Sequence, residues 1–137
     1  MLILTLSAAC ATVQAADWQP FGGSDTAELK LDQDSIKEHN GLREVWSMWN
    51  FKEPRKNEGD ASFPSFRSYQ DLTEYNCRAK TMRLTKEILF AEVDGGGAKL
   101  DHSDALKNMK FSAPAKDSVA EKMMDIVCAF PLNAKAK

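Results

Sequence analysis

The sequence predicts an α+β fold, in which an antiparallel β-sheet meander is packed by one C-terminal α-helix and closed by one disulfide. Apolar and polar residues alternate over the first two thirds of the chain, which is typical of half-buried strands. Near the C-terminus the apolar residues instead recur at three- and four-residue steps, the period of a helix. Only Cys77 and Cys128 follow the apolar N-terminal stretch, and such a pair predicts one bridge in an exported domain.

Residues 1–15 have the features of a signal peptide. Leu2–Leu6 is an uncharged apolar run, and small residues lead from it to the A-x-A-like site Val13-Gln14-Ala15. The run is shorter than the roughly 20 apolar residues that span a bilayer. We therefore interpret residues 1–15 as a leader and residues 16–137 as one domain without a transmembrane segment.

Two alternatives for this stretch stay open. Leu6–Cys10 also resembles a lipoprotein signal, in which an acylated Cys10 would anchor the protein to a membrane. The other alternative is a buried N-terminal helix or strand of a cytosolic protein.

The spacing of the cysteines favours a structural bridge. In an oxidising compartment, a bond between Cys77 and Cys128 would close a loop of about 50 residues, worth about 4 kcal/mol in chain entropy. A redox site would favour a closely spaced pair such as C-x-x-C. With only His39 and His102 elsewhere, the cysteines make a poor zinc site, so we expect no metal and no cofactor.

The first strands are bounded by polar turns. Ala27–Leu31 alternates and stops at Asp32–Ser35, which is typical of a turn or a helix cap. Asn40-Gly41 predicts a strand reversal before a strand over Leu42–Lys52. Large apolar groups on both sides of this strand predict that it is central in the sheet.

Further strands follow a long loop. Prolines, a glycine and mixed charges in Glu53–Ser65 predict an exposed hairpin loop. Phe66–Cys77 and Arg78–Val93 are rich enough in β-forming residues for two more strands. Asp94–Gly97 predicts a turn before Ala98–Leu100.

Ser118–Phe130 is predicted to form the helix. Ser118 and Glu121 have capping-box spacing, and Pro131 ends the helix. Cys128 then lies near the end of the helix. The side predicted to face the sheet consists of Val119, Met123, Ile126, Val127 and Phe130.

Two groups of residues are candidates for ligand binding. If the strand pairing is regular, Arg78, Lys80 and Lys86 share one strand face and form a basic stripe suited to acidic proteins or sulfated glycans. The alternative for this stripe is a solvated, edge-protecting strand face. Trp46 and Trp49 point to opposite faces, so one belongs to the core and the other is a candidate binding anchor. The alternative is that both tryptophans are structural.

Charge and motifs argue against several other functions. The formal net charge of −2 gives no case for nucleic acid or for an anionic membrane as partner. No G-x-S-x-G, H-E-x-x-H or P-loop motif occurs, and we interpret Asp101–Asp104 as a surface turn. Asp32–Asp34 lacks the glycine and the distant glutamate of a calcium loop. We expect a protein that is not an enzyme.

Short pieces spread over the chain after the leader carry a family resemblance: Trp18, Asp34-Ser35-Ile36, Val45–Phe51, Tyr75–Arg78, Pro114, Asp117-Ser118 and Ile126–Cys128. Together they resemble the bacterial surface-adhesin protein E family. The resemblance implies an exported β-sheet domain with one disulfide, in the periplasm or on the outer surface. For the best-known member it implies binding to host matrix proteins.

These observations predict a non-enzymatic, adhesin-like binding protein of the bacterial envelope, with matrix proteins or sulfated glycans as candidate partners. The alternative is a periplasmic module that binds a small molecule or inhibits an enzyme through an apolar pocket between helix and sheet. A purely structural envelope component is the third hypothesis. A closed, aromatic-lined pocket would favour the second, and a flat basic and aromatic patch would favour the first.

Overall fold

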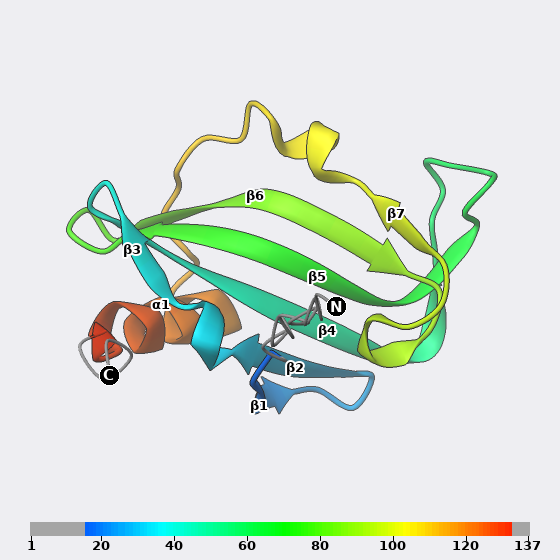
Figure 1. Cartoon of the computed structure of the whole chain (residues 1–137), viewed down its shortest axis with the longest axis horizontal. Coiled ribbons are helices and arrows are strands. Elements are labelled where there is room, and N and C mark those ends of the chain that lie inside the picture. Colours follow the sequence, from blue (N-terminus) through cyan, green and yellow to red (C-terminus); the bar gives the residue numbers. More distant parts are fainter. Residues whose placement is uncertain (1–15, 133–137) are drawn as a thin grey trace, which may run out of the picture.

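The computed structural model describes residues 16–132, which form one seven-stranded antiparallel sheet and one α-helix (Figure 1). The predicted signal peptide, Cys10 and the last residues of the tail lie outside this range. The elements are β1 (Trp18–Gly23), β2 (Ala27–Asp32), β3 (Lys37–His39), β4 (Leu42–Lys56), β5 (Ser65–Asn76), β6 (Thr81–Phe90), β7 (Lys99–Asp101) and α1 (Val119–Ala129). The predicted fold class, an antiparallel sheet packed by a C-terminal helix, is confirmed.

The sheet has the strand order β1-β2-β4-β5-β6-β7, and β3 pairs with one end of β4. β4 lies between β2 and β5, so its predicted central position is confirmed. Val45 and Met48, on opposite sides of β4, are 0% and 2% exposed. The reversal between β3 and β4 is also confirmed, because Asn40 and Gly41 have φ of 51° and 76°, the left-handed values of a type I′ turn.

Two strands, β1 and β3, are additions to the predicted set. β1 contains a proline and two glycines and lacks clear alternation, yet it pairs with β2. The Asp17 N–H beside it donates to Asp32 Oδ1 at 3.0 Å. β3 is exposed throughout and pairs only with β4. Backbone pairing defines β3, and in β1 only the first and fourth residues, Trp18 and Phe21, are half-buried, so an alternating hydrophobic pattern does not reveal either strand.

Two predicted boundaries are corrected by the pairing. β4 continues to Lys56 and β5 begins at Ser65, so the loop predicted over Glu53–Ser65 is confined to residues 57–64. The strand predicted over Arg78–Val93 begins only at Thr81. A turn precedes it, in which the Ala79 N–H donates to Asn76 Oδ1 at 3.0 Å.

The expectation that Arg78, Lys80 and Lys86 share one strand face is wrong. Arg78 and Lys80 belong to the β5–β6 turn, where Lys80 has φ of 56°. A bulge at Thr85 also shifts the register of β6 against β5. The bulge places Arg83 and Lys86 on one face, whereas regular alternation would separate them.

The predicted helix is confirmed, with small differences in its buried side. Ser118 Oγ accepts a hydrogen bond from the Glu121 N–H at 3.2 Å, and the last helical residue is Ala129. The fully buried residues of α1 are Met123, Met124 and Val127. They pack on Leu29, Leu31, Val45 and Tyr75 of the sheet, which forms the main core.

Val119 and Ile126 are less buried against the sheet than predicted. They are 40% and 46% exposed and line a groove beside Phe21 of β1. The helix lies at one end of the sheet only, at the lower left of Figure 1, so its flanks stay open to solvent.

The predicted disulfide is confirmed. Cys77, directly after β5, is bonded to Cys128 near the end of α1, with their Cα atoms 5.7 Å apart. Arg43 of β4 adds a second attachment, because its Nη1 donates to the carbonyl oxygens of Val127 and Phe130, each at 2.8 Å. The C-terminal end of α1 is therefore held both covalently and by hydrogen bonds.

Replacing Cys77 and Cys128 together by serine should lower the melting temperature markedly. The 11-residue helix is too short to be stable alone. Loss of the bridge also returns about 4 kcal/mol of chain entropy to the unfolded state. Thermal unfolding followed by circular dichroism measures the effect, with the reduced wild-type domain as a matched control. An unchanged melting temperature in both samples would contradict a stabilising role.

Candidate ligand-binding site

Directly opposite residues of paired strands lie on the same face, so the strand register decides which side chains meet. We call the side of the sheet on which α1 packs the helix face, and the opposite side the outer face. On the helix face, Ser47, Asp71 and Glu87 form one row across β4, β5 and β6. This row places two carboxyl groups side by side within the sheet.

A cavity of about 190 Å³ lies between α1 and the helix face. Its volume equals that of about six water molecules in the liquid. Apolar side chains from both layers form most of its walls: Trp49, Met82 and Leu84 from the sheet, and Val119, Ala120 and Met123 from the helix. The apolar lining with a few polar groups resembles that of small-molecule sites, but the cavity is smaller than the roughly 300 to 1,000 Å³ usual for them, so only a compact ligand fits.

Two buried polar atoms at this cavity, Asp71 Oδ1 and the Tyr75 hydroxyl, make no hydrogen bond of good geometry within residues 16–132. Asp71 is 6% exposed and Tyr75 is 0% exposed. Burial raises the pKa of the Tyr75 hydroxyl. Burial, reinforced by the Glu87 carboxyl, raises the pKa of Asp71 to about 8. The Asp71 carboxyl interacts with Glu87, and the Tyr75 hydroxyl interacts with Thr73. Because a buried polar atom with incomplete hydrogen bonding is destabilising, a polar group that enters the cavity would add a favourable contact to each.

Asp71 is the inner member of a row of titratable groups that reaches the surface. Glu87 stands opposite it, and Glu87 Oε1 lies 2.9 Å from Nδ1 of the exposed His102. Backbone contacts fix this arrangement, because the His102 N–H donates to the Glu87 carbonyl at 2.8 Å. Since two neighbouring carboxyl groups resist double ionisation, the pair retains a proton at Asp71 around neutral pH.

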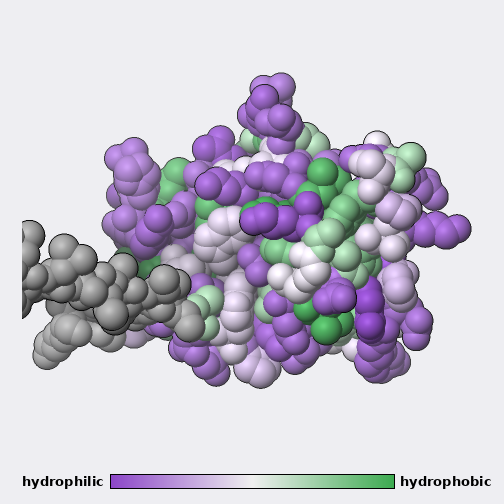
Figure 2. All heavy atoms as spheres, turned by 45° about the vertical axis from the view of Figure 1, so that its right-hand side comes forward, coloured by the Kyte–Doolittle hydropathy of each residue, from purple (hydrophilic) through white to green (hydrophobic). Residues whose placement is uncertain are grey.

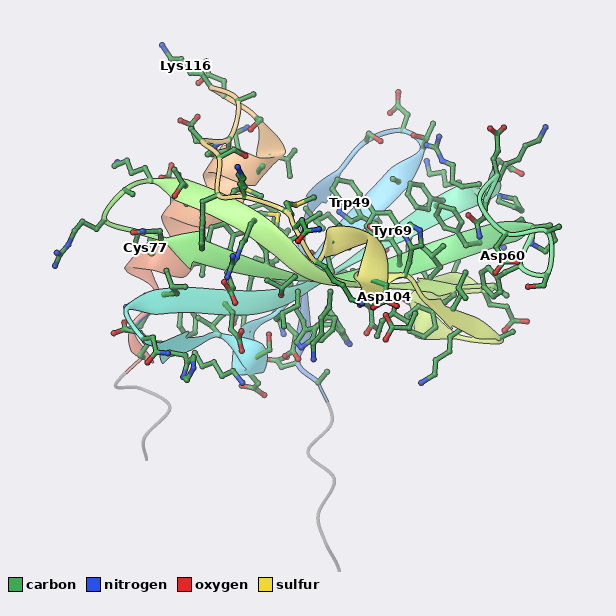
Figure 3. The ribbon with its side chains drawn as sticks, turned by 90° about the horizontal axis from the view of Figure 1, so that it is seen from above. Trp49, Asp60, Tyr69, Cys77, Asp104 and Lys116 are labelled. Atoms are coloured by element: carbon green, nitrogen blue, oxygen red, sulfur yellow. A yellow bond between two sulfur atoms is a disulfide. The ribbon has the colours of Figure 1, made fainter. Side chains whose placement is uncertain are left out.

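Aromatic rings continue the helix face beyond the cavity. The ring centroids of Trp49 and Tyr69 are 6.4 Å apart, and Phe51 and Phe66 lie 5.7 Å and 6.2 Å from Tyr69. Figure 3 shows Trp49 and Tyr69 side by side, between the end of the sheet that carries Cys77 and the opposite end near Asp60. Trp49 therefore belongs to the cavity wall and to the aromatic cluster.

The predicted opposite orientation of the two tryptophans is confirmed. Trp49 lies on the helix face, and Trp46 lies on the outer face in one row with Leu72 and Lys86. Both indoles are half-buried. Only Trp46 remains a candidate anchor for a partner that binds the outer face.

The predicted basic residues are exposed but do not form one compact stripe. Arg78 and Lys80 occupy the β5–β6 turn, and Lys86 lies on the outer face of β6. At a strand rise of about 3.3 Å per residue, roughly 20 Å of strand separates Lys86 from that turn. Arg83, between them, is engaged by Glu74 at 2.9 Å and by the Phe111 ring.

Asp71, Tyr75 and Glu87 were not predicted as site residues. A signal for Asp71 was present, because it stands two residues from Tyr69 and Thr73 and so shares their face of the strand. Glu87 gave no such signal, since the bulge at Thr85 decides which face it occupies.

The polar cluster Asp101–Asp104 lies at the surface, where β7 leads into the short 3-10 helix η3 (Ser103–Leu106). Within residues 16–132, no group of three His, Cys, Asp or Glu side chains is placed to hold a metal ion.

The fold and its bridge define a small α+β domain in which a C-terminal helix is attached to one end of an antiparallel sheet. The profile of the surface-adhesin protein E family matches residues 18–129, and the chain belongs to this family. The resemblance seen in the sequence is thereby confirmed.

Solved structures with this fold include protein E of Haemophilus influenzae. One is 17% identical to the chain, covers 80% of each chain and has a TM-score of 0.57. Another, from a non-typeable Haemophilus influenzae, is 16% identical, covers 90% of this chain and 83% of its own, and has a TM-score of 0.60. At such identities the similarity demonstrates the fold alone. No curated protein matches significantly.

The free energy of unfolding should fall as the pH rises from about 4 to about 8. Asp71 keeps its proton in the folded state up to about pH 8 but loses it near pH 4 when unfolded, so the folded state binds more protons in this window. The limiting slope for one group is about 1.4 kcal/mol per pH unit. Urea unfolding at several pH values measures it.

Asp71→Asn should flatten this dependence and raise stability at pH 8 relative to the wild type. Asp104→Asn is the matched control, because Asp104 is an exposed carboxylate that pairs with Lys107 at 3.0 Å. If both variants kept the wild-type slope, Asp71 would not be the group responsible.

Proposed function

We propose that the chain is an exported, non-enzymatic binding protein of the bacterial envelope, adhesin-like in function, which recognises protein or glycan ligands. Its membership of the surface-adhesin protein E family over residues 18–129 is the observation that carries this proposal. Host matrix proteins and sulfated glycans are the candidate ligands. The place of action is the periplasm or the outer surface.

Export is supported by two independent features. The apolar stretch and A-x-A-like site within residues 1–15 fit a cleaved leader. The bond between Cys77 and Cys128 fits an oxidising compartment outside the cytoplasm. In the described range, no helix has the length and apolar character needed to cross a membrane. A lipid anchor at Cys10 remains the alternative form of attachment.

The outer face and the β5–β6 turn offer surfaces for a macromolecular ligand. Trp46 of β4 and Lys86 of β6 lie in one row on the outer face, and Arg78 and Lys80 belong to the turn between β5 and β6. Figure 2 shows hydrophilic side chains over much of the visible surface with smaller apolar areas between them. A half-buried aromatic anchor with Lys86 in its row, and two further cations at the β5–β6 turn, suits an acidic protein or a sulfated glycan.

The cavity favours the second candidate function, a periplasmic module that binds a small molecule. It lies between helix and sheet, and Trp49 and two methionines form part of its wall. This cavity is on the helix face, whereas Trp46 and Lys86 are on the outer face. The two functions therefore concern different surfaces and are separable by mutation.

The oxidised domain should bind saturably to at least one matrix protein or to heparin at physiological salt. Replacing Arg78 and Lys80 together by glutamine, or Lys86 alone, should lower the salt concentration that elutes the domain from heparin, because each lost cation removes an ionic contact. Heparin chromatography and biolayer interferometry measure the two kinds of binding.

Replacing Lys116 and Lys122, both exposed, is the matched control, because it changes the net charge equally at another place. Equal losses for the control and the Arg78/Lys80 variant would indicate a non-specific charge effect. If the wild-type domain bound none of the matrix proteins and did not bind heparin, the adhesin proposal would be contradicted.

Trp46→Ala should weaken binding to a protein ligand by about tenfold or more if the indole is an anchor. Trp49→Phe, on the helix face, should leave that affinity unchanged. Circular dichroism of both variants checks that the fold persists. An equal loss of affinity in the two variants would argue against the outer face as the binding surface.

A further inference from the structure

We propose that the cavity between α1 and the helix face binds a compact apolar ammonium ion, whose head pairs with Asp71 and Tyr75 and whose body packs on Trp49 and Met123. This site is separate from the outer face, and the inference stands whether or not the domain binds matrix proteins.

The two buried polar atoms without a well-formed hydrogen bond define the head-group position. Asp71 Oδ1 and the Tyr75 hydroxyl both belong to residues that line the cavity, and both residues are more than nine-tenths buried. Ser47 and Thr73 add two hydroxyl groups to the same wall. An ammonium group has three donors and no acceptor, and this wall offers it several acceptors.

The charges around the cavity favour a cation over an anion. Asp71 is the only charged-type residue in its lining, and Glu87 stands directly behind it. Among residues 16–132, no lysine or arginine lines the cavity. A buried cation is costly unless it is paired, and here Asp71 supplies the partner.

The other side chains that line the cavity determine the polarity and the size of the ligand's body. Trp49, Met82, Leu84 and Met123 offer apolar contacts, and methionines adapt to irregular shapes. Val119 lines the cavity and is 40% exposed, so the cavity reaches the surface at the N-terminal end of α1. A volume of about six waters suits a body of about five or six carbon atoms.

Binding is coupled to loss of a proton. At neutral pH the Asp71 carboxyl holds a proton because of burial and of Glu87 beside it. The incoming ammonium ion keeps its own protons, and the Asp71 proton leaves to the solvent. One positive charge therefore enters as another departs, and the net charge of the buried pair with its ligand is unchanged.

Few other titratable groups face Asp71. Tyr69 and Tyr75 lie on its own strand, Glu87 lies on β6, and His102 contacts Glu87 from the start of η3. The cavity residues from β4 and α1 are not titratable. Affinity for the ammonium ion should therefore fall by up to about tenfold per pH unit as the pH drops below 8, because protons compete for Asp71.

Cyclopentylammonium and cyclopentanol are the test pair, because they match in shape and differ in charge. In two-dimensional NMR of the full oxidised domain, cyclopentylammonium should shift the Trp49 indole and Met123 methyl signals saturably. Calorimetry in two buffers of different ionisation enthalpy should detect release of about one proton per bound ion at pH 7. Cyclopentanol should bind at least tenfold more weakly and release none.

Asp71→Asn should lower the affinity for cyclopentylammonium at least tenfold, because a charge-assisted contact is lost. It should also abolish the proton release that accompanies binding. Ala120→Leu should exclude both probes by filling the cavity, and Asp104→Asn should change nothing. The proposal is overturned if neither probe shifts the cavity signals at millimolar concentration, which would indicate a cavity that holds only water. Equal binding of the ion to wild type and Asp71→Asn would overturn it as well.

Discussion

The attachment of α1 to one end of the sheet is the constraint on which the rest of the structure depends. The helix has 11 residues and buries only three of them, so it needs fixed points. Cys128 and the contacts of Arg43 provide them, all at its C-terminal end. The N-terminal half of the helix, with Val119, Ala120 and Met123, lies away from these fixed points, and there the packing leaves a cavity.

The polar row beneath α1 carries a cost that packing alone does not explain. Asp71 and Glu87 face each other across β5 and β6, and Asp71 is almost fully buried. A core formed only for stability would favour apolar side chains at these positions, because buried carboxyl groups oppose folding when ionised. A row of this kind, next to a cavity and linked to a surface histidine, is typical of a functional site.

Membership of the surface-adhesin protein E family describes the whole domain, whereas the cavity is one local feature of it. The family match spans the whole domain, from β1 to the end of α1, and so describes the scaffold. On that scaffold the two faces of the sheet differ: the outer face carries Trp46 and Lys86, and the helix face carries the aromatic cluster and the cavity. The proposed macromolecular surface and the cavity therefore lie on opposite faces of one small sheet.

The sequence by itself determined the elements that depend on local chemistry. Four features could be predicted from the sequence: the Asn40-Gly41 turn, the Ser118 cap, the central strand β4, and the pair of Cys77 and Cys128. Each depends on neighbouring residues or on the spacing of residues of one kind along the chain. Tertiary structure decided the site. The bulge at Thr85 turned Glu87 toward Asp71, and the turn at residues 77–80 removed two cations from the expected stripe. Strand register is set by contacts between distant segments, and a shift of one residue exchanges the two faces of a strand.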